Sequence, residues 1–206
     1  MVRANINFTM PDNNLQTIMF TSALPGEGKS TSAANVAIVF AQEGKKVLLV
    51  DADMRKPTLH YTFQKTNSSG LSGVLAKQWK LKDVLKETEV SGMHLITSGL
   101  IPSNPAELLG AKSMEVLLEE LKARYDIIIF DTPPVLSVVD AQILSNKCDG
   151  TILVINAGST KKENALKAKN VLQIAKANLL GTVLNNYKAE KDQYYYYESE
   201  NEARRD

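Results

Sequence analysis

The sequence is poor in the features that mark secreted, membrane-spanning or nucleic-acid-binding proteins. Its 206 residues contain one cysteine, Cys148, which excludes an intramolecular disulfide and indicates a reducing compartment. No apolar run approaches the roughly 18 residues that span a bilayer, and the chain does not begin with a signal-peptide pattern. The net charge of +1 gives no electrostatic basis for binding nucleic acid. We therefore expect a cytoplasmic protein that binds no nucleic acid and reaches a membrane only through a partner.

The apolar residues that are present follow an α/β pattern. They make up 44% of the chain, as in an ordinary globular domain. Almost continuous apolar runs, typical of parallel strands buried on both faces, alternate with stretches of helical periodicity. This alternation predicts an α/β fold with a mainly parallel β-sheet flanked by helices. The expected strands are 15–23, 45–53, 92–99, 125–134, 151–158 and 181–186, and the expected helices are 29–42, 105–123 and 163–177.

The composition changes near the C-terminus. Residues 188–206, KAEKDQYYYYESENEARRD, contain no aliphatic residue other than Ala189 and Ala203. Such a segment cannot bury enough apolar surface to order itself. We therefore expect one folded domain over residues 1–187, followed by a flexible, tyrosine-rich tail over residues 188–206.

The stretch TSALPGEGKST, residues 21–31, is similar to a phosphate-binding loop. It fits the pattern G-x-x-x-x-G-K-[ST], except that Ala23 replaces the first glycine. A strand before it and a helix after it would direct backbone N–H groups toward an anion. Lys29 would reach the β- and γ-phosphates of ATP, or the β-phosphate of ADP, and the Ser30 hydroxyl would bind Mg²⁺. The expected nucleotide-binding residues of this loop are Pro25, Gly26, Glu27, Gly28, Lys29, Ser30 and Thr31.

Carboxylates follow two of the predicted strands. Asp51 and Asp53 end the run VLLVDADMR, and Asp131 ends YDIIIFDTPP. Ligands of open α/β sheets bind at the carboxyl edge, so one of the first pair could orient Mg²⁺ and the other could accept a proton. We expect Asp51 nearer the attacking hydroxyl and Asp53 nearer the metal. The expected catalytic residues are Lys29, Asp51, Asp53 and Arg55, and the expected metal-binding residues are Ser30, Asp53 and Asp131.

Four further side chains carry groups capable of chemistry. Asn185, at the end of the last predicted strand, offers the paired donor and acceptor that an adenine edge needs. An asparagine at a strand end is equally a turn residue, and the residues alone leave both readings open. His60 and His94 lack metal-ligand spacing and are expected to be structural or surface residues. Cys148 is expected to be a small buried residue.

These motifs resemble the bacterial tyrosine kinases of capsule and exopolysaccharide synthesis over nearly the whole chain. The resemblance lies in SALPGEGKST, LLVDADMRKP, IIIFDTPP, SGLIPSNPAELL and the tyrosine-rich tail. It implies a P-loop NTPase fold related to the MinD and ParA ATPases, and a non-specific protein-tyrosine kinase that uses ATP and regulates polysaccharide synthesis and export. A MinD- or ParA-like positioning ATPase is the alternative. Leu24 stands where those ATPases carry a signature lysine, which favours the kinase.

The resemblance also implies partners. Such kinases are phosphorylated in trans on a tail cluster, and those of the split Gram-positive type are activated at the inner face of the membrane by a separate transmembrane adaptor of the chain-length-determinant type. A cognate tyrosine phosphatase and protein substrates are implied as well. Arg3 matches the last residue of the ring-forming E-x-x-R-x-x-R motif, whose beginning would precede Met1, so we expect a truncated chain and leave a homo-oligomeric ring open. The implied phosphorylation sites are Tyr194, Tyr195, Tyr196 and Tyr197.

Overall fold

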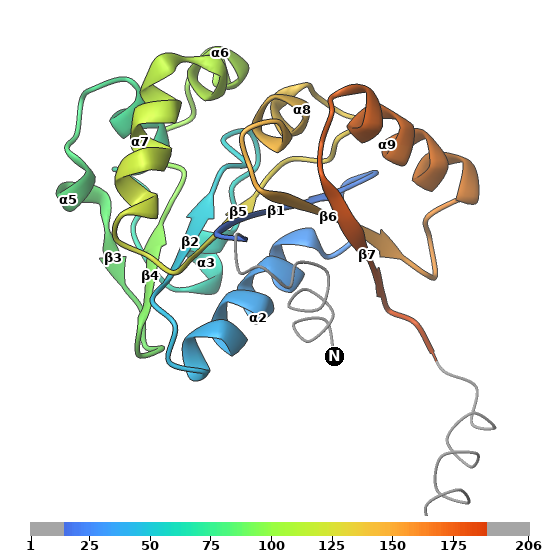
Figure 1. Ribbon diagram of the computed structural model, residues 1–206, viewed down its shortest axis with the longest axis horizontal. Coiled ribbons are helices and arrows are strands. Elements are labelled where there is room, and N and C mark those ends of the chain that lie inside the picture. The colour runs from blue at the N-terminus through green and yellow to red at the C-terminus, as the bar shows by residue number, and fades with distance from the viewer. Residues whose placement is uncertain (1–14, 189–206) are drawn as a thin grey trace, which may run out of the picture.

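The computed structural model describes residues 15–188, in which a seven-stranded sheet lies between two layers of helices (Figure 1). The strands are β1 (Thr17–Ser22), β2 (Val47–Asp51), β3 (Lys86–Glu87), β4 (Met93–Ile96), β5 (Ile127–Asp131), β6 (Gly150–Asn156) and β7 (Leu179–Asn185). In the order β3-β4-β2-β5-β1-β6-β7, all neighbours are parallel except β3, which runs antiparallel to β4. The predicted α/β class is confirmed. Arg3 and the tyrosines 194–197 lie outside the described residues.

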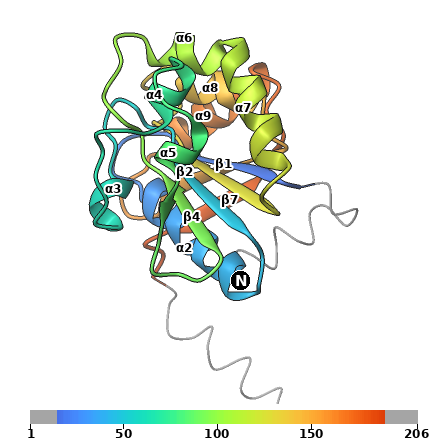
Figure 2. The same ribbon diagram turned by 90° about the vertical axis from the view of Figure 1, so that its left-hand side faces the viewer.

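Helices cover both faces of the sheet. They are α2 (Lys29–Gln42), α3 (Leu59–Thr62), α4 (Leu71–Leu75), α5 (Leu81–Val84), α6 (Pro105–Gly110), α7 (Lys112–Lys122), α8 (Asp140–Ser145) and α9 (Lys162–Ile174). Helix α2 packs on one face, and α6, α7, α8 and α9 lie on the other (Figures 1 and 2). Both views place α5 beside α7.

The central strands are buried because neither of their faces meets solvent. Every residue of β1, β2 and β5 is buried, as the unbroken apolar runs predict for parallel strands between helix layers. Successive side chains point to opposite faces. Leu48 and Phe130 therefore belong to the core under α7 and α8, whereas Leu49 and Phe20 pack with α2.

The predicted helix 105–123 is wrong in one respect, because it is two helices. Ala111 has φ −70° and ψ 157°, an extended conformation that separates α6 from α7. The break turns the chain so that α6 packs on α8 while α7 packs on β5. The helix predicted over 163–177 also ends early, at Ile174, because Lys176 adopts the left-handed conformation that closes a helix (φ 58°).

Cys148 lies in the core after α8. It is 8% exposed, so the prediction of a buried small residue is confirmed. Burial, and then the neighbouring charge of Asp149, raise the pKa of its thiol. Among residues 15–188, no helix combines the length and apolar character needed to cross a bilayer.

Asp149 joins three segments of the fold. Its Oδ2 accepts hydrogen bonds from the backbone N–H of Gln16 (3.1 Å) and of Thr17 (2.8 Å), and its Oδ1 accepts one from Lys122 Nζ (2.9 Å). Burial alone would raise the pKa of Asp149, but the bonds from Lys122 and Thr17 bring it below its ordinary value. The ionised carboxylate thus anchors the start of β1 to β6 and α7.

We predict that Asp149→Asn lowers the free energy of unfolding by about 1–2 kcal/mol at neutral pH, since charge-assisted bonds are lost. A carboxyl whose pKa is depressed on folding stabilises the native state above its unfolded pKa, and this contribution disappears as pH falls through the folded value. The difference from wild type should therefore shrink below about pH 4. Urea titrations at several pH values measure it, with exposed Glu119→Gln on α7 as the control. A difference independent of pH would contradict the assignment.

Candidate active site

The carboxyl ends of three adjacent strands bring the predicted site residues together. Strand β5 lies between β1 and β2, and Asp131 is in register with both Phe20 and Asp51. The loop that follows β1 leads directly into α2, whose first residue is Lys29. Segments that are far apart in sequence thus meet at one edge of the sheet, where open α/β folds bind their ligands.

Lys29 lies among the carboxylates. Its Nζ is 3.0 Å from Asp53 Oδ2 and 3.4 Å from Asp131 Oδ1, and its side chain is only 11% exposed. It also donates a hydrogen bond to Ser30 Oγ (3.2 Å). Burial alone would lower the pKa of Lys29, but Asp131 and Asp53 raise it above its usual value. The ammonium therefore stays charged at the mouth of the loop.

Asp131 has an oxygen without a partner. The residue is fully buried, and its Oδ2 forms no hydrogen bond within the part of the chain that the structure describes. Burial raises the pKa of this carboxyl, and the positive charge of Lys29 offsets part of that rise. Residues 15–188 contain no cluster of three or more His, Cys, Asp or Glu side chains that could hold a metal ion unaided. A cation at Asp131 would therefore have to share its coordination shell with water, a hydroxyl or phosphate oxygens, as Mg²⁺ commonly does.

Asp51 and Asp53 differ in their surroundings. Asp51 Oδ2 accepts hydrogen bonds from the backbone N–H of Thr58 (3.2 Å) and Leu59 (3.0 Å). Burial, and then the negative charge of Asp131, raise the pKa of Asp51 to about 7. Asp53 instead contacts Lys29. The pair therefore combines a carboxylate poised to gain or lose a proton near neutrality with one that carries an ion pair.

Arg55 forms an ion pair that the sequence analysis missed. Its Nε and Nη2 donate to the two oxygens of Asp140, at 2.8 and 3.0 Å. Asp140 is fully buried and is the first residue of α8, while 40% of the Arg55 side chain remains exposed. This bidentate pair raises the pKa of Arg55, and it fixes the guanidinium beside the carboxyl edge.

The loop between β1 and α2 has the conformation of an anion cradle. Gly26 and Gly28 have φ of 81° and 91°, a region that favours glycine. Gly28 is the N-cap of α2, provides no side-chain cap, and is followed by no acidic residue in the first turn. The first N–H groups of the 14-residue helix are therefore left for an anion. Pro25, Gly26 and Thr31 are exposed around this opening.

Glu27 points beneath the loop. It is 2% exposed, and its Oε2 accepts hydrogen bonds from the backbone N–H of Ala23 (2.8 Å) and Leu24 (3.1 Å). Its Oε1 accepts a short bond from the hydroxyl of Thr160, which the sequence analysis missed. Asn185 Nδ2 donates to the backbone oxygen of Glu27 (3.1 Å). The loop is thus tied to the segment after β6 and to the end of β7.

Comparison with known proteins identifies relatives over the whole described region. Residues 15–184 match the family described as AAA domain. The chain is 51% identical over 196 residues to tyrosine-protein kinase YwqD of Bacillus subtilis (strain 168), covering 95% of this chain and 83% of that protein. It is 39% identical over 196 residues to putative tyrosine-protein kinase CapB of Staphylococcus aureus, covering 95% and 86%.

Solved structures show the same fold. The chimerical protein CapA2B2 is 42% identical, with a TM-score of 0.88 and coverage of 91% of this chain and 83% of that one. The kinase domain of Escherichia coli tyrosine kinase ETK is 34% identical, with a TM-score of 0.88 and coverage of 92% and 74%. The septum site-determining protein MinD from Pyrococcus horikoshii OT3, complexed with Mg-ADP, is 26% identical, with a TM-score of 0.72 and coverage of 86% and 72%. The fold is therefore that of the P-loop NTPases, and MinD is the more distant of these neighbours.

We predict that Gly28→Ala destabilises the protein more than Gly26→Ala does. Both substitutions strain a left-handed backbone, but a Cβ at Gly28 would lie 2.0 Å from Asn185 Nδ2, whereas one at Gly26 meets nothing within 4 Å. The cost of Gly26→Ala should be about 1 kcal/mol, and that of Gly28→Ala should be clearly larger. Thermal unfolding measures both. Combining Gly28→Ala with Asn185→Ala should recover part of the loss, and an additive result would show that the two side chains do not meet.

Proposed function

This chain belongs to the family of bacterial tyrosine-protein kinases, and from that premise we propose that it transfers the γ-phosphoryl group of ATP to tyrosines of its own tail in trans. The observation that carries the proposal is the edge of the sheet, where Lys29 contacts two buried carboxylates and Asp51 has a pKa near neutrality. A kinase needs a fixed positive charge and a proton acceptor in one place.

Each residue of the site has a separate proposed role. Lys29 neutralises charge that develops on the transferred phosphoryl group, and the N–H groups from Gly26 to Thr31 hold the phosphate oxygens. Asp51 accepts the proton of the attacking tyrosine hydroxyl. Ser30, Asp53 and Asp131 would hold Mg²⁺, directly or through water, and the unpartnered Oδ2 of Asp131 fits that role. When bound, Mg²⁺ would supply positive charge that offsets the negative charge of the phosphate groups.

Two other predicted residues keep narrower proposed roles. Asn185 uses one amide N–H to hold the loop through Glu27, which leaves Oδ1 and the second N–H for an adenine edge. Arg55 presents its charge beside the site while Asp140 orients it, so it suits contact with a phosphate or an acidic substrate. Leu24, at the position of the signature lysine of the positioning ATPases, is exposed at 36% and provides no charge.

The same proposal extends to the cellular process that the chain serves and to its protein partners. We propose that the chain regulates capsular or exopolysaccharide synthesis and export, and that a transmembrane adaptor recruits it to the inner face of the membrane and activates it. A cognate phosphatase would reverse the modification of Tyr194–Tyr197, and a homo-oligomeric ring would bring one tail to a neighbour's site. Further protein substrates complete the proposed set. The membership of the tyrosine-kinase family supports these expectations.

We predict that the tail is labelled between chains. A protein with Tyr194, Tyr195, Tyr196 and Tyr197 changed to Phe should bind ATP but lose most phosphotyrosine, because its acceptor hydroxyls are gone. The Lys29→Met protein should fold but have no kinase activity. Loss of a charge contact to the transition state should lower the rate by on the order of 10³-fold or more.

Mixing the two proteins with ATP and Mg²⁺, with and without an adaptor fragment, is the test. An anti-phosphotyrosine blot should show label on the Lys29→Met chain only in the mixture. Label on Lys29→Met protein incubated alone would refute the site assignment, and its absence from the mixture would refute transfer between chains.

We also predict a pH limb that belongs to Asp51. As the proton acceptor, Asp51 must be ionised, and its pKa is raised to about 7, so kcat/KM should rise through neutrality as pH increases. Below that inflection the rate should fall by about tenfold per pH unit. Asp51→Asn should reduce the rate and remove the limb, whereas Asp53→Asn should reduce the rate and weaken the Mg²⁺ dependence of ADP binding in calorimetry. A limb that persists in Asp51→Asn, or altered metal dependence in that variant alone, would reverse the two roles.

A further inference from the structure

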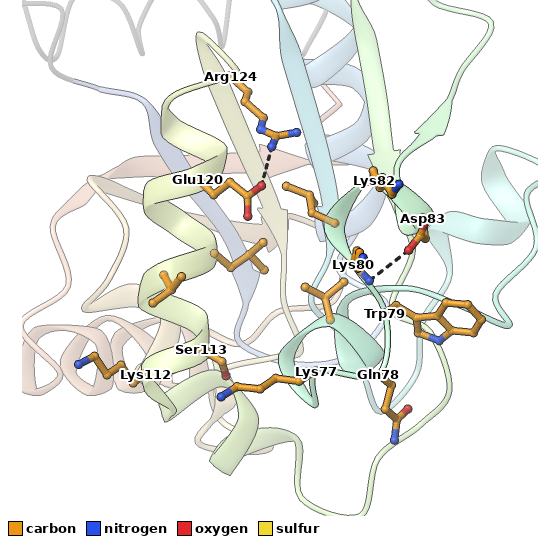
Figure 3. Close-up of a pocket in the computed structure, with 14 residues that line it drawn as sticks. Lys77, Gln78, Trp79, Lys80, Lys82, Asp83, Lys112, Ser113, Glu120 and Arg124 are labelled. Atoms are coloured by element: carbon orange, nitrogen blue, oxygen red, sulfur yellow. Dashed lines mark hydrogen bonds and ion pairs between the residues drawn. The ribbon is translucent and has the colours of Figure 1, made fainter.

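A second surface outside the proposed active site has the character of a binding groove. It lies between the α4–α5 segment and α7, and it encloses about 1030 Å³ (Figure 3). Leu81 and Leu117, which are nearly fully buried, contribute to its apolar floor. None of the residues assigned to catalysis or nucleotide binding lines it.

Trp79 is a fixed aromatic side chain on this groove. It is 48% exposed, yet its indole packs directly on Gly73, where a Cβ would lie 2.4 Å from Trp79 Cδ1. Lys77 adopts the left-handed conformation (φ 59°) that ends α4 and turns the chain back, and the backbone N–H of Trp79 donates to the Gly73 oxygen (3.2 Å). The ring is therefore exposed but already positioned, which lowers the entropic cost of binding against it.

The rim of the groove is basic. Five cationic side chains and two carboxylates line it, a net formal charge of +3. Arg124 is paired with Glu120 at 2.6 Å, but four exposed lysines form no ion pair with any described carboxylate. Figure 3 shows Lys77 reaching toward the start of α7. The four lysines are Lys77, Lys80, Lys82 and Lys112.

The sequence of this chain contains a segment with the complementary chemistry. Between residues 190 and 202 it has five carboxylates, one lysine and the tyrosine run 194–197. Acidic side chains would meet the lysines, and a tyrosine ring could stack on Trp79. We infer that the groove is a docking site for the acidic C-terminal segment, residues 188–206, of a second copy of this chain.

A second copy fits better than the same chain. The α4–α5 wall of the groove lies toward the β3 and β4 edge of the sheet (Figure 1), and Lys188 follows β7 at the opposite edge. Five strand spacings separate β4 from β7, about 24 Å in a straight line, and a path over the helix layer is longer. Residue 198 is ten positions past Lys188, at most about 35 Å when fully extended. Docking within one chain would therefore leave the segment little slack.

Docking in the groove would serve the proposed kinase reaction, and that part of the inference rests on the proposed function. Lys112 begins α7 directly after α6, and α6 packs on α8, whose Asp140 binds Arg55. One end of the groove thus lies on the side of the catalytic edge. A segment held there would keep its tyrosines at high local concentration near the neighbour's Asp51.

The test uses Trp79 as its reporter, because it is the sole tryptophan of the 206 residues. A peptide with the sequence of residues 188–206 is titrated into the full chain without ATP. The tryptophan is excited selectively and its fluorescence emission is recorded. Emission should change saturably, and the affinity should weaken in high salt. Lys80→Glu/Lys82→Glu should weaken binding by about tenfold or more, whereas Lys167→Glu/Lys169→Glu on the exposed face of α9 should change it by less than about twofold. A peptide with Glu198, Glu200 and Glu202 replaced by Gln should bind the wild-type chain about as weakly as the unaltered peptide binds the Lys80→Glu/Lys82→Glu variant.

Three results would overturn the inference. They are an unchanged emission on adding the peptide, equal effects of the two double variants, and a response to vesicles of anionic phospholipid but not to the peptide. A second measurement uses Lys29→Met chains as the acceptor. When the kinase is the Lys80→Glu/Lys82→Glu variant in place of the wild type, KM for this acceptor should rise several-fold and kcat should not change. If no phosphotyrosine forms under any condition, the proposed function fails, while the peptide titration still decides the groove.

Discussion

The burial of three carboxylates at the ends of two paired strands is the constraint on which the rest of the site depends. Parallel pairing puts Asp51 in register with Asp131, and Asp53 follows two residues later, so the negative charges cannot separate without breaking the sheet. Burial and the charge of Asp131 raise the pKa of Asp51, burial and the charge of Asp53 raise that of Asp131, and Lys29 offsets part of both shifts. Loop, helix and strand ends are therefore coupled electrostatically, so that a change at Lys29 or Asp53 alters the protonation of Asp51 and Asp131.

The loop that would hold phosphate is shaped by side chains from distant segments. Glu27 bonds the backbone beneath its own loop and also the hydroxyl of Thr160, 133 positions away. Asn185, at the end of β7, donates to the Glu27 carbonyl and packs against Gly28. Because these contacts are buried or half-buried, the loop is preorganised by the folded sheet as well as by its glycines.

The sequence predicts those features that have a local physical cause. Apolar runs without alternation indicate strands buried on both faces, and the positions where they stop locate Asp51 and Asp131 at one edge. The break at Ala111 was missed because helical periodicity continues on both sides of it, although Gly110 just before it is a residue type that commonly ends helices. Asp140 was missed for a different reason. An acidic residue at a helix start is common, and its pairing with Arg55 spans 85 positions of sequence. Of the candidate site, then, the residue types could be predicted, while their partners depended on tertiary contacts.

The burial of Cys148 has a practical consequence. The thiolate is the reactive form of cysteine, and a buried thiol with a raised pKa seldom forms it. Since the chain contains no other cysteine, the native protein should be nearly inert to maleimide reagents while folded. A cysteine introduced on the surface would then be alkylated selectively in the otherwise unaltered sequence. Fluorophores or spin labels could in this way be placed at single chosen positions. Alkylation of Cys148 would then occur only after the chain unfolds, so its rate would report unfolding.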